Sequence, residues 1–121
     1  MKKFSFSYKE KLHEQTDFNK VFKNGLKLEN KIVKVLVYKK TQKTLRRLGL
    51  VTSKKVGSAV QRNTAKRRLR EIFRTNKHLL EPGIDIIFIS KPLTASSDYN
   101  SLKKAVLDLL QSAGLYKPEK P

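Results

Sequence analysis

The sequence predicts a single α+β domain, a sandwich of helices and sheet in the order αβββαβα with one βαβ crossover. Three segments carry apolar residues at helical spacing, and four others have the patterns of strands. With 121 residues, the chain has the size of one domain and can bury one modest core. We therefore expect one domain over residues 1–121, with frayed tails over about 1–8 and 117–121.

The first helix is predicted in the segment TDFNKVFKNG, where Phe18 and Phe22 fall on one face. Thr16 or Asp17 can cap its start. Gly25 can adopt a left-handed conformation just past its end. One short helix is therefore expected before the first strand.

Three strands are predicted next, over residues 26–28, 31–39 and 48–53. The middle segment alternates valines with other residues, and its β-branched content favours a strand. The polar, basic linker KTQKTLRR precedes the third strand and is predicted to be a hairpin connection or a flexible loop.

The second half of the chain predicts a long helix, a buried strand and a final helix. Ser58 and Gln61 form an S-x-x-Q capping box, and the helix that follows is expected to reach about His78. The apolar run over 84–89 has the pattern of a strand buried on both faces. Leucine and valine then recur at helical spacing in a helix that ends at Gly114.

The charge of the chain points to a nucleic-acid partner. There are 28 Lys and Arg residues against 10 Asp and Glu residues, a formal net charge of +18. Such an excess costs stability through self-repulsion and is typical of proteins that bind nucleic acid, less often of those that bind anionic membranes. The absence of cysteine excludes disulfides and thiolate zinc sites. No apolar run has the length of a signal peptide or membrane span, so we expect a cytoplasmic protein without a membrane partner.

The long helix carries two different stripes. At about 100° per residue, one face collects Ala65, Leu69, Ile72 and Phe73. A second face collects Asn63, Lys66, Arg67, Arg70 and Arg74, with Arg62 near the boundary. Glu71 is the only acid between residues 30 and 80, whereas a solvated helix normally mixes charges of both signs.

The start of this helix adds to the basic stripe. Lys54 and Lys55 precede the helix N-terminus, where phosphate oxygens find both ammonium groups and backbone N–H donors. The pattern predicts a surface for an RNA or DNA backbone. Predicted strands flank the helix on both sides, which disfavours a helix-turn-helix and favours RNA over DNA.

The segment SKKVGSAVQRNTAKRRLRE (53–71) resembles the signature of the bacterial ribonuclease P protein subunit. The segments DFNKVFKNG, LGLVTSKK and GIDIIFISKP and the terminal LY also resemble that family. The resemblance implies the small protein partner of a catalytic RNA. That enzyme is an endoribonuclease that hydrolyses a phosphodiester bond to remove the 5′ leader from precursor tRNA. Magnesium is expected to be held mainly by the RNA and substrate.

The family also implies a ribosomal-protein-like fold with a left-handed βαβ crossover, against the general rule. Its expected partners are ribonuclease P RNA and precursor tRNA, with no obligate protein partner. The protein alone is expected to be inactive.

Residues matching the family's pattern, together with Arg74 from the basic stripe, give the expected RNA-binding set: Lys54, Lys55, Arg62, Asn63, Lys66, Arg67, Arg70 and Arg74. Thr64 departs from the pattern, because the family often has arginine there. The RNA contact that this arginine would make is then either absent or made by Arg67 or Arg68.

A leader-binding cleft between the first helix and the sheet is also expected from the family. Phe18 and Phe22 match two of its aromatic positions and would stack leader bases, although the pattern alone favours ordinary core residues. Leu36 stands where an aromatic residue is common, and Tyr38, on the same strand face, can compensate.

No catalytic residue or metal ligand is predicted in the chain itself. The aspartates are scattered at 17, 85, 98 and 108, whereas a two-metal site needs clustered carboxylates. His13 and His78 are predicted to be surface residues without nearby carboxylates. The alternative function is a structural RNA-binding protein of ribosomal type, which would not prefer precursor over mature tRNA.

Overall fold

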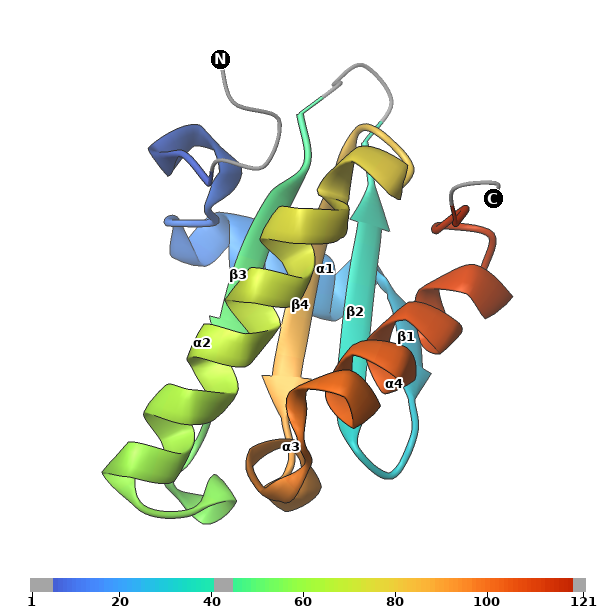
Figure 1. Cartoon of the computed structure of the whole chain (residues 1–121). Helices are drawn as coiled ribbons and strands as arrows, with labels where there is room; N and C mark the ends of the chain where they lie inside the picture. The colour runs from blue at the N-terminus through green and yellow to red at the C-terminus, as the bar shows by residue number, and fades with distance from the viewer. Residues whose placement is uncertain (1–5, 41–44, 119–121) are drawn as a thin grey trace.

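The computed structural model describes residues 6–40 and 45–118, which form a four-stranded sheet covered by helices on both faces (Figure 1). The strands are β1 (Leu26–Glu29), β2 (Val33–Lys39), β3 (Arg47–Val51) and β4 (Ile84–Ser90). Their spatial order is β1-β2-β4-β3, with antiparallel β1/β2 and β2/β4 pairs and a parallel β3/β4 pair. Strand β3 therefore lies at an edge of the sheet, beside β4.

The helices are α1 (Gln15–Asn24), α2 (Ala59–Asn76), α3 (Pro92–Ser96) and α4 (Tyr99–Ser112). Short 3₁₀ turns are η1 (Tyr8–Glu10), η2 (Lys54–Val56) and η3 (Lys77–Leu79). The predicted αβββαβα order is confirmed, with α3 as an additional short helix in a segment expected to be a linker. Residues 41–44 of the predicted hairpin linker and most of the predicted frayed tails lie outside the described residues.

The β3–α2–β4 crossover is left-handed. Both strands run downward in Figure 1, α2 returns upward in front of them, and β4 lies to the right of β3. A right-handed crossover would place β4 on the other side of β3. The uncommon hand implied by the family resemblance is therefore present.

Two hydrophobic layers lie on opposite sides of the sheet. The larger one packs α2 and α4 against residues such as Val35, Ile86 and Phe88. The smaller one packs Val21 of α1 against Leu36 and Ile87. Successive residues of β4 face opposite layers, so this strand is buried on both sides as its apolar run predicted.

Local signals in the sequence are largely confirmed around α2. The Gln61 N–H donates to Ser58 Oγ (3.2 Å), and the Ser58 N–H donates to Gln61 Oε1 (2.8 Å), which completes the predicted capping box. The helix ends at Asn76, and η3 extends the turn to Leu79. Gly114 has the expected left-handed conformation after α4, with φ of 76°.

The predicted ends of α1 are wrong in detail. Glu14 occupies the N-cap position, so Asp17 lies inside the first turn instead of capping it. Gly25 is extended, with φ of −75°. Glycine suits this position because a Cβ would lie 2.4 Å from the Val21 carbonyl oxygen and 3.0 Å from that of Val37. Backbone carbonyls of α1 and of β2 that lie close to this position, rather than a left-handed turn, explain this glycine.

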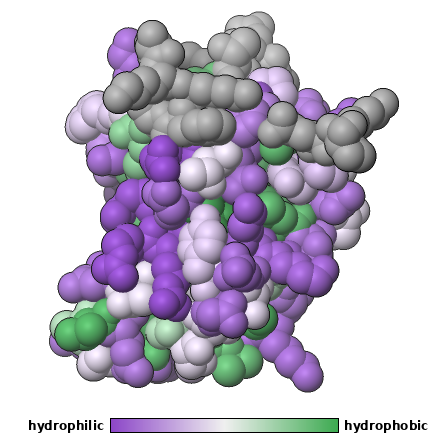
Figure 2. All heavy atoms as spheres, viewed as in Figure 1, coloured by the Kyte–Doolittle hydropathy of each residue, from purple (hydrophilic) through white to green (hydrophobic). Residues whose placement is uncertain are grey.

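The face that carries α2 and α4 is mostly hydrophilic (Figure 2). Within the described residues, no helix combines the length and apolar character needed to cross a bilayer.

Candidate nucleic-acid interface

Helix α2 separates its apolar and basic residues as predicted. Its inward stripe is at most 1% exposed and consists of Ala65, Leu69, Ile72 and Phe73. On the outward stripe Asn63, Arg67 and Arg70 are exposed, and Arg62 and Lys66 are half-buried. The packing of α2 on the sheet therefore leaves a row of cations facing solvent.

Six cations of the predicted RNA-binding set have no carboxylate partner in the described part of the chain: Lys54, Lys55, Arg62, Lys66, Arg67 and Arg70. Some cations elsewhere are paired with acids, as Lys77 is with Glu10 and Lys91 with Glu29. The acids of this protein are thus distributed away from the start and middle of α2. Such a row of uncompensated charge favours a polyanionic ligand.

Arg74 differs from the rest of the predicted set. Its Nε donates to Glu71 Oε2 (3.0 Å), and its Nη2 contacts the other carboxylate oxygen. The hydrogen bond from Arg74 lowers the pKa of Glu71 and in turn raises the pKa of Arg74. The single acid of α2 therefore compensates Arg74, which the i, i+3 spacing could have indicated.

Two further arginines donate to backbone carbonyls. Arg62 Nη1 donates to the Gly57 carbonyl oxygen (2.6 Å), which holds Arg62 over the start of α2. Arg68 Nη1 donates to the Ser97 carbonyl oxygen and so points toward α4. Arg67 and Arg68 were the two residues expected to supply the contact that an arginine at position 64 would make. Of these two, Arg67 is the exposed one.

The aromatic residues of α1 lie over the opposite face of the sheet. Phe18 is half-buried and packs against the layer that contains Val21, whereas Phe22 is 37% exposed. Their ring centroids are 6.5 Å apart with an interplanar angle of 29°. Phe18 rests on Gly49, where a Cβ would lie 2.7 Å from the ring. Both rings therefore keep surface that a planar base can contact.

Leu36 departs from the predicted cleft. It is 1% exposed and belongs to the core between α1 and the sheet, because Val21 packs over it. Tyr38 lies on the same face of β2, as predicted, and is half-buried. Of the four residues expected to contact a leader, Leu36 is the one that the fold withdraws from solvent.

A hollow of about 340 Å³ lies at the edge strand β3 and is lined by residues from both hydrophobic layers. It is lined by Phe6, Lys11, Leu12, His13, Phe18, Leu48, Gly49, Leu50 and Arg70. Phe18 comes from the predicted leader-binding set and Arg70 from the predicted RNA-binding set. The tertiary structure therefore brings members of both sets to one hollow.

Sequence reasoning missed the N-terminal side of this hollow. His13 stacks on Tyr8 with 3.9 Å between ring centroids, and Lys11 Nζ lies 5.2 Å from the centre of the Phe6 ring. Phe6 in turn packs edge-on against Phe73 of α2. Phe6 and Tyr8 were the signal for this packing, within a segment predicted to be frayed.

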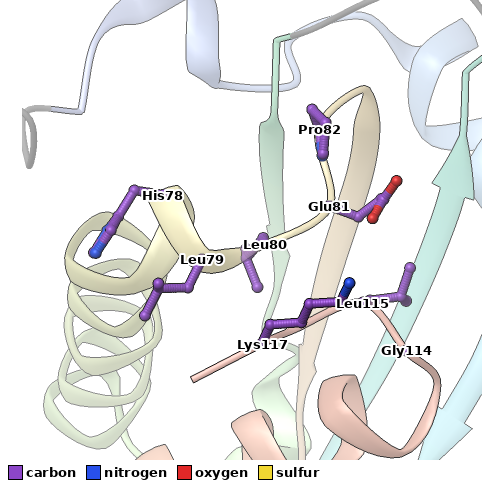
Figure 3. Close-up of a pocket in the computed structure, with 8 residues that line it drawn as sticks. All are labelled: His78, Leu79, Leu80, Glu81, Pro82, Gly114, Leu115 and Lys117. Carbon is purple, nitrogen blue, oxygen red and sulfur yellow. The ribbon is translucent and has the colours of Figure 1, made fainter. Parts of the chain in front are cut away.

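A second hollow, of about 280 Å³, contains none of the predicted site residues (Figure 3). It lies between the end of α2 and the chain beyond α4, and His78, Glu81 and Lys117 are among its lining residues. His78 is half-buried and its ring nitrogens are shielded from solvent, so the expectation of a surface histidine is wrong.

The aspartates do not form a metal centre. Asp17 and Asp85 are brought together, but both contact the guanidinium of Arg47. No group of three His, Cys, Asp or Glu side chains suited to a metal ion occurs within residues 6–40 and 45–118.

Comparisons with known proteins identify the relatives of this chain. Residues 6–114 match the model of the family described as Ribonuclease P. The ribonuclease P protein component of Clostridium kluyveri is 35% identical over 88% of this chain and 96% of its own length. That of Thermotoga maritima is 36% identical over 88% and 94%, respectively.

Solved structures agree with these relatives. The RNase P protein of Staphylococcus aureus superposes with a TM-score of 0.80, at 27% identity, over 89% of this chain and 98% of that one. The RNase P protein from Thermotoga maritima gives a TM-score of 0.75, at 36% identity, over 85% and 96%.

Proposed function

The chain belongs to the ribonuclease P protein family, and on that premise we propose that α2 binds the enzyme's RNA while α1 contacts the 5′ leader of precursor tRNA. As a ribonuclease P protein subunit, it functions in tRNA processing and binds RNA. The proposal concerns which surfaces of the chain carry out these contacts.

The row of uncompensated cations along α2 is the observation that carries the first half of the proposal. Arg67 and Arg70 are exposed and lack carboxylate partners in the described chain, and Lys66 lies between them and the core. Phosphates relieve the mutual repulsion of such cations and release condensed counterions when they bind. Arginine also grips a phosphate through two parallel hydrogen bonds, which positions an RNA backbone firmly.

The second half of the proposal rests on the position of Phe18 and Phe22. Their rings lie on the face of the sheet opposite α2. The β3 edge, with Arg70 on one side of the hollow and Phe18 on the other, offers a route between the two surfaces. Single-stranded RNA is held by base stacking on aromatic rings combined with backbone contacts to cations. A leader that leaves the catalytic RNA near α2 would reach these rings along that edge.

Phosphodiester hydrolysis is assigned in this proposal to the RNA, with magnesium held by RNA and substrate. The described residues do not fit a magnesium site, because Asp17 and Asp85 are neutralised by Arg47 and no third acidic ligand is near. The contribution of this chain is to bind and orient. A cytoplasmic location and the absence of an obligate protein partner belong to the same proposal, since both proposed ligands are RNA molecules.

Reconstitution tests the proposal. The protein is added to a bacterial ribonuclease P RNA at low magnesium, and 5′ cleavage of a precursor tRNA is followed. We expect cleavage with both components and none with the protein alone.

An Arg67→Ala variant should weaken RNA binding and reduce the salt slope by about one phosphate contact. The control is Lys104→Ala on α4, which removes one charge from an exposed residue paired with Asp108. Equal losses for both variants would show that net charge, rather than α2, governs binding.

A further inference from the structure

Arg47 connects helix α1 to the sheet through a network of charged side chains. Its Nε and Nη2 donate to the two oxygens of Asp85 at 2.8 and 2.7 Å. Its Nη1 donates to Asp17 Oδ2 at 3.2 Å. Lys40 Nζ lies 3.0 Å from Asp85 Oδ1. One guanidinium group thus joins β3, β4 and the first turn of α1.

The network is buried at its centre. Asp85 is 2% exposed, and a carboxylate at such a site is stable only with close positive partners. The bidentate contact from Arg47 and the contact from Lys40 provide them. The hydrogen bond to Asp85 also raises the pKa of Arg47. Because two cations face two anions, the network is close to neutral, and Arg47 does not belong to the row of cations available to phosphate.

The register of β3 places a second contact beside the first. Arg47 and Gly49 are two residues apart, so they lie on the same face of the strand. Asp17 contacts Arg47, and the next residue, Phe18, rests on Gly49. The absence of a side chain at Gly49 lets the Phe18 ring approach the strand. An ionic contact and an apolar contact therefore fix the first turn of α1 at adjacent points.

We propose that Arg47 is a positioning residue that, through Asp17, sets where α1 and its rings Phe18 and Phe22 lie over the sheet. Arg47 touches no RNA in this role and acts only through α1. The inference rests on the proposed function of α1 as a leader-contacting helix. It goes further by assigning part of the preference for precursor over mature tRNA to the Arg47–Asp17 ion pair, which does not itself contact the leader.

The test uses Asp17→Asn and Arg47→Lys in the reconstituted holoenzyme. Asp17→Asn weakens the link to α1 while leaving Arg47 on Asp85. Arg47→Lys keeps the charge, but one ammonium group cannot span both carboxylates in the same geometry. Affinity for precursor tRNA should fall roughly threefold to tenfold for either variant, with affinity for mature tRNA and for the catalytic RNA unchanged. In the free, folded protein, the ring NMR signals of Phe18 and Phe22 should shift.

Two reference variants make the outcome decisive. Glu81→Gln breaks an exposed ion pair with Lys39 (3.5 Å) and should leave every quantity unchanged. Phe22→Ala should itself lower precursor affinity. If Phe22→Ala has that effect but Asp17→Asn changes neither selectivity nor the ring signals, the positioning role of Arg47 is refuted. If Phe22→Ala has no effect, the leader-contacting role of α1 fails first.

Discussion

Replacing Glu71 by glutamine should tighten binding of the protein to ribonuclease P RNA. Glu71 is the acid that holds Arg74, through an Nε–Oε2 contact of 3.0 Å and a second contact from Nη2. Both side chains are on the surface of α2, so their interaction is screened by solvent and its loss costs the fold little. The substitution keeps the shape of the side chain but removes its charge, and so weakens the attraction that competes with phosphate for Arg74.

The expected gain in RNA affinity follows from counting one additional phosphate contact. Each contact adds about 0.7–0.9 to the slope of log K against log salt. At about 0.15 M salt, one contact then raises affinity by about four- to sixfold relative to 1 M salt, where its contribution vanishes. Arg70, which is exposed and has no carboxylate partner among the described residues, should give the reverse result. Arg70→Ala should lower affinity and slope by the same amounts.

The assay is a titration of catalytic RNA with protein at several salt concentrations. Asp108→Asn is the matched control, because it removes one exposed carboxylate from the Lys104 pair on α4 and raises net charge equally. Glu71→Gln should steepen the salt slope, and Asp108→Asn should leave it nearly unchanged. The same gain from both variants, or none from Glu71→Gln, would refute the idea that Glu71 withholds Arg74 from RNA.

Three other predictions concern α1 and the N-terminal segment. Gly49→Ala should destabilise the protein by about 1–3 kcal/mol in denaturant unfolding, because its Cβ would force Phe18 to move; unchanged stability would show that the ring adjusts freely. Phe22→Ala should weaken precursor binding by about 1–3 kcal/mol per base lost from stacking, and equal losses for mature tRNA would contradict the leader contact. Burial raises the pKa of Glu10, but hydrogen bonds from Lys77 and Ser7 together lower it by more, so the net shift of the pKa is downward. The stabilisation from Glu10 is then present above the ordinary glutamate pKa of 4.5 and is lost as pH falls through the lower folded pKa. The melting-temperature gap between wild type and Glu10→Gln should therefore narrow in acid.

Features that depend on neighbours in the sequence were predictable. The Ser58–Gln61 capping box, the two stripes of α2 and the turn at Gly114 all follow from spacing along the chain. The apolar pattern of β4 likewise predicted burial on both faces. In each case the contacts that determine the feature join residues close together in the sequence, or they follow the side-chain periodicity of a single helix or strand.

Features that depend on distant partners were not predictable from those patterns. Leu36 has the alternation of a strand residue, but only the placement of α1 covers it. Gly25 is favoured by the nearby carbonyls of Val21 and, from β2, of Val37, and not by a left-handed conformation. Asp85 was counted among scattered acids, whereas in the fold it is the buried centre of the Arg47 network.

The sequence by itself determined the number and order of the main elements, the basic stripe of α2 and, through its resemblance, the family. These are properties of residue type and spacing. Only the tertiary structure decided which cations remain available and how α1 is fixed over the sheet. Charge compensation and close packing act through space, so residues 38 positions apart, such as Arg47 and Asp85, become partners once β3 lies beside β4.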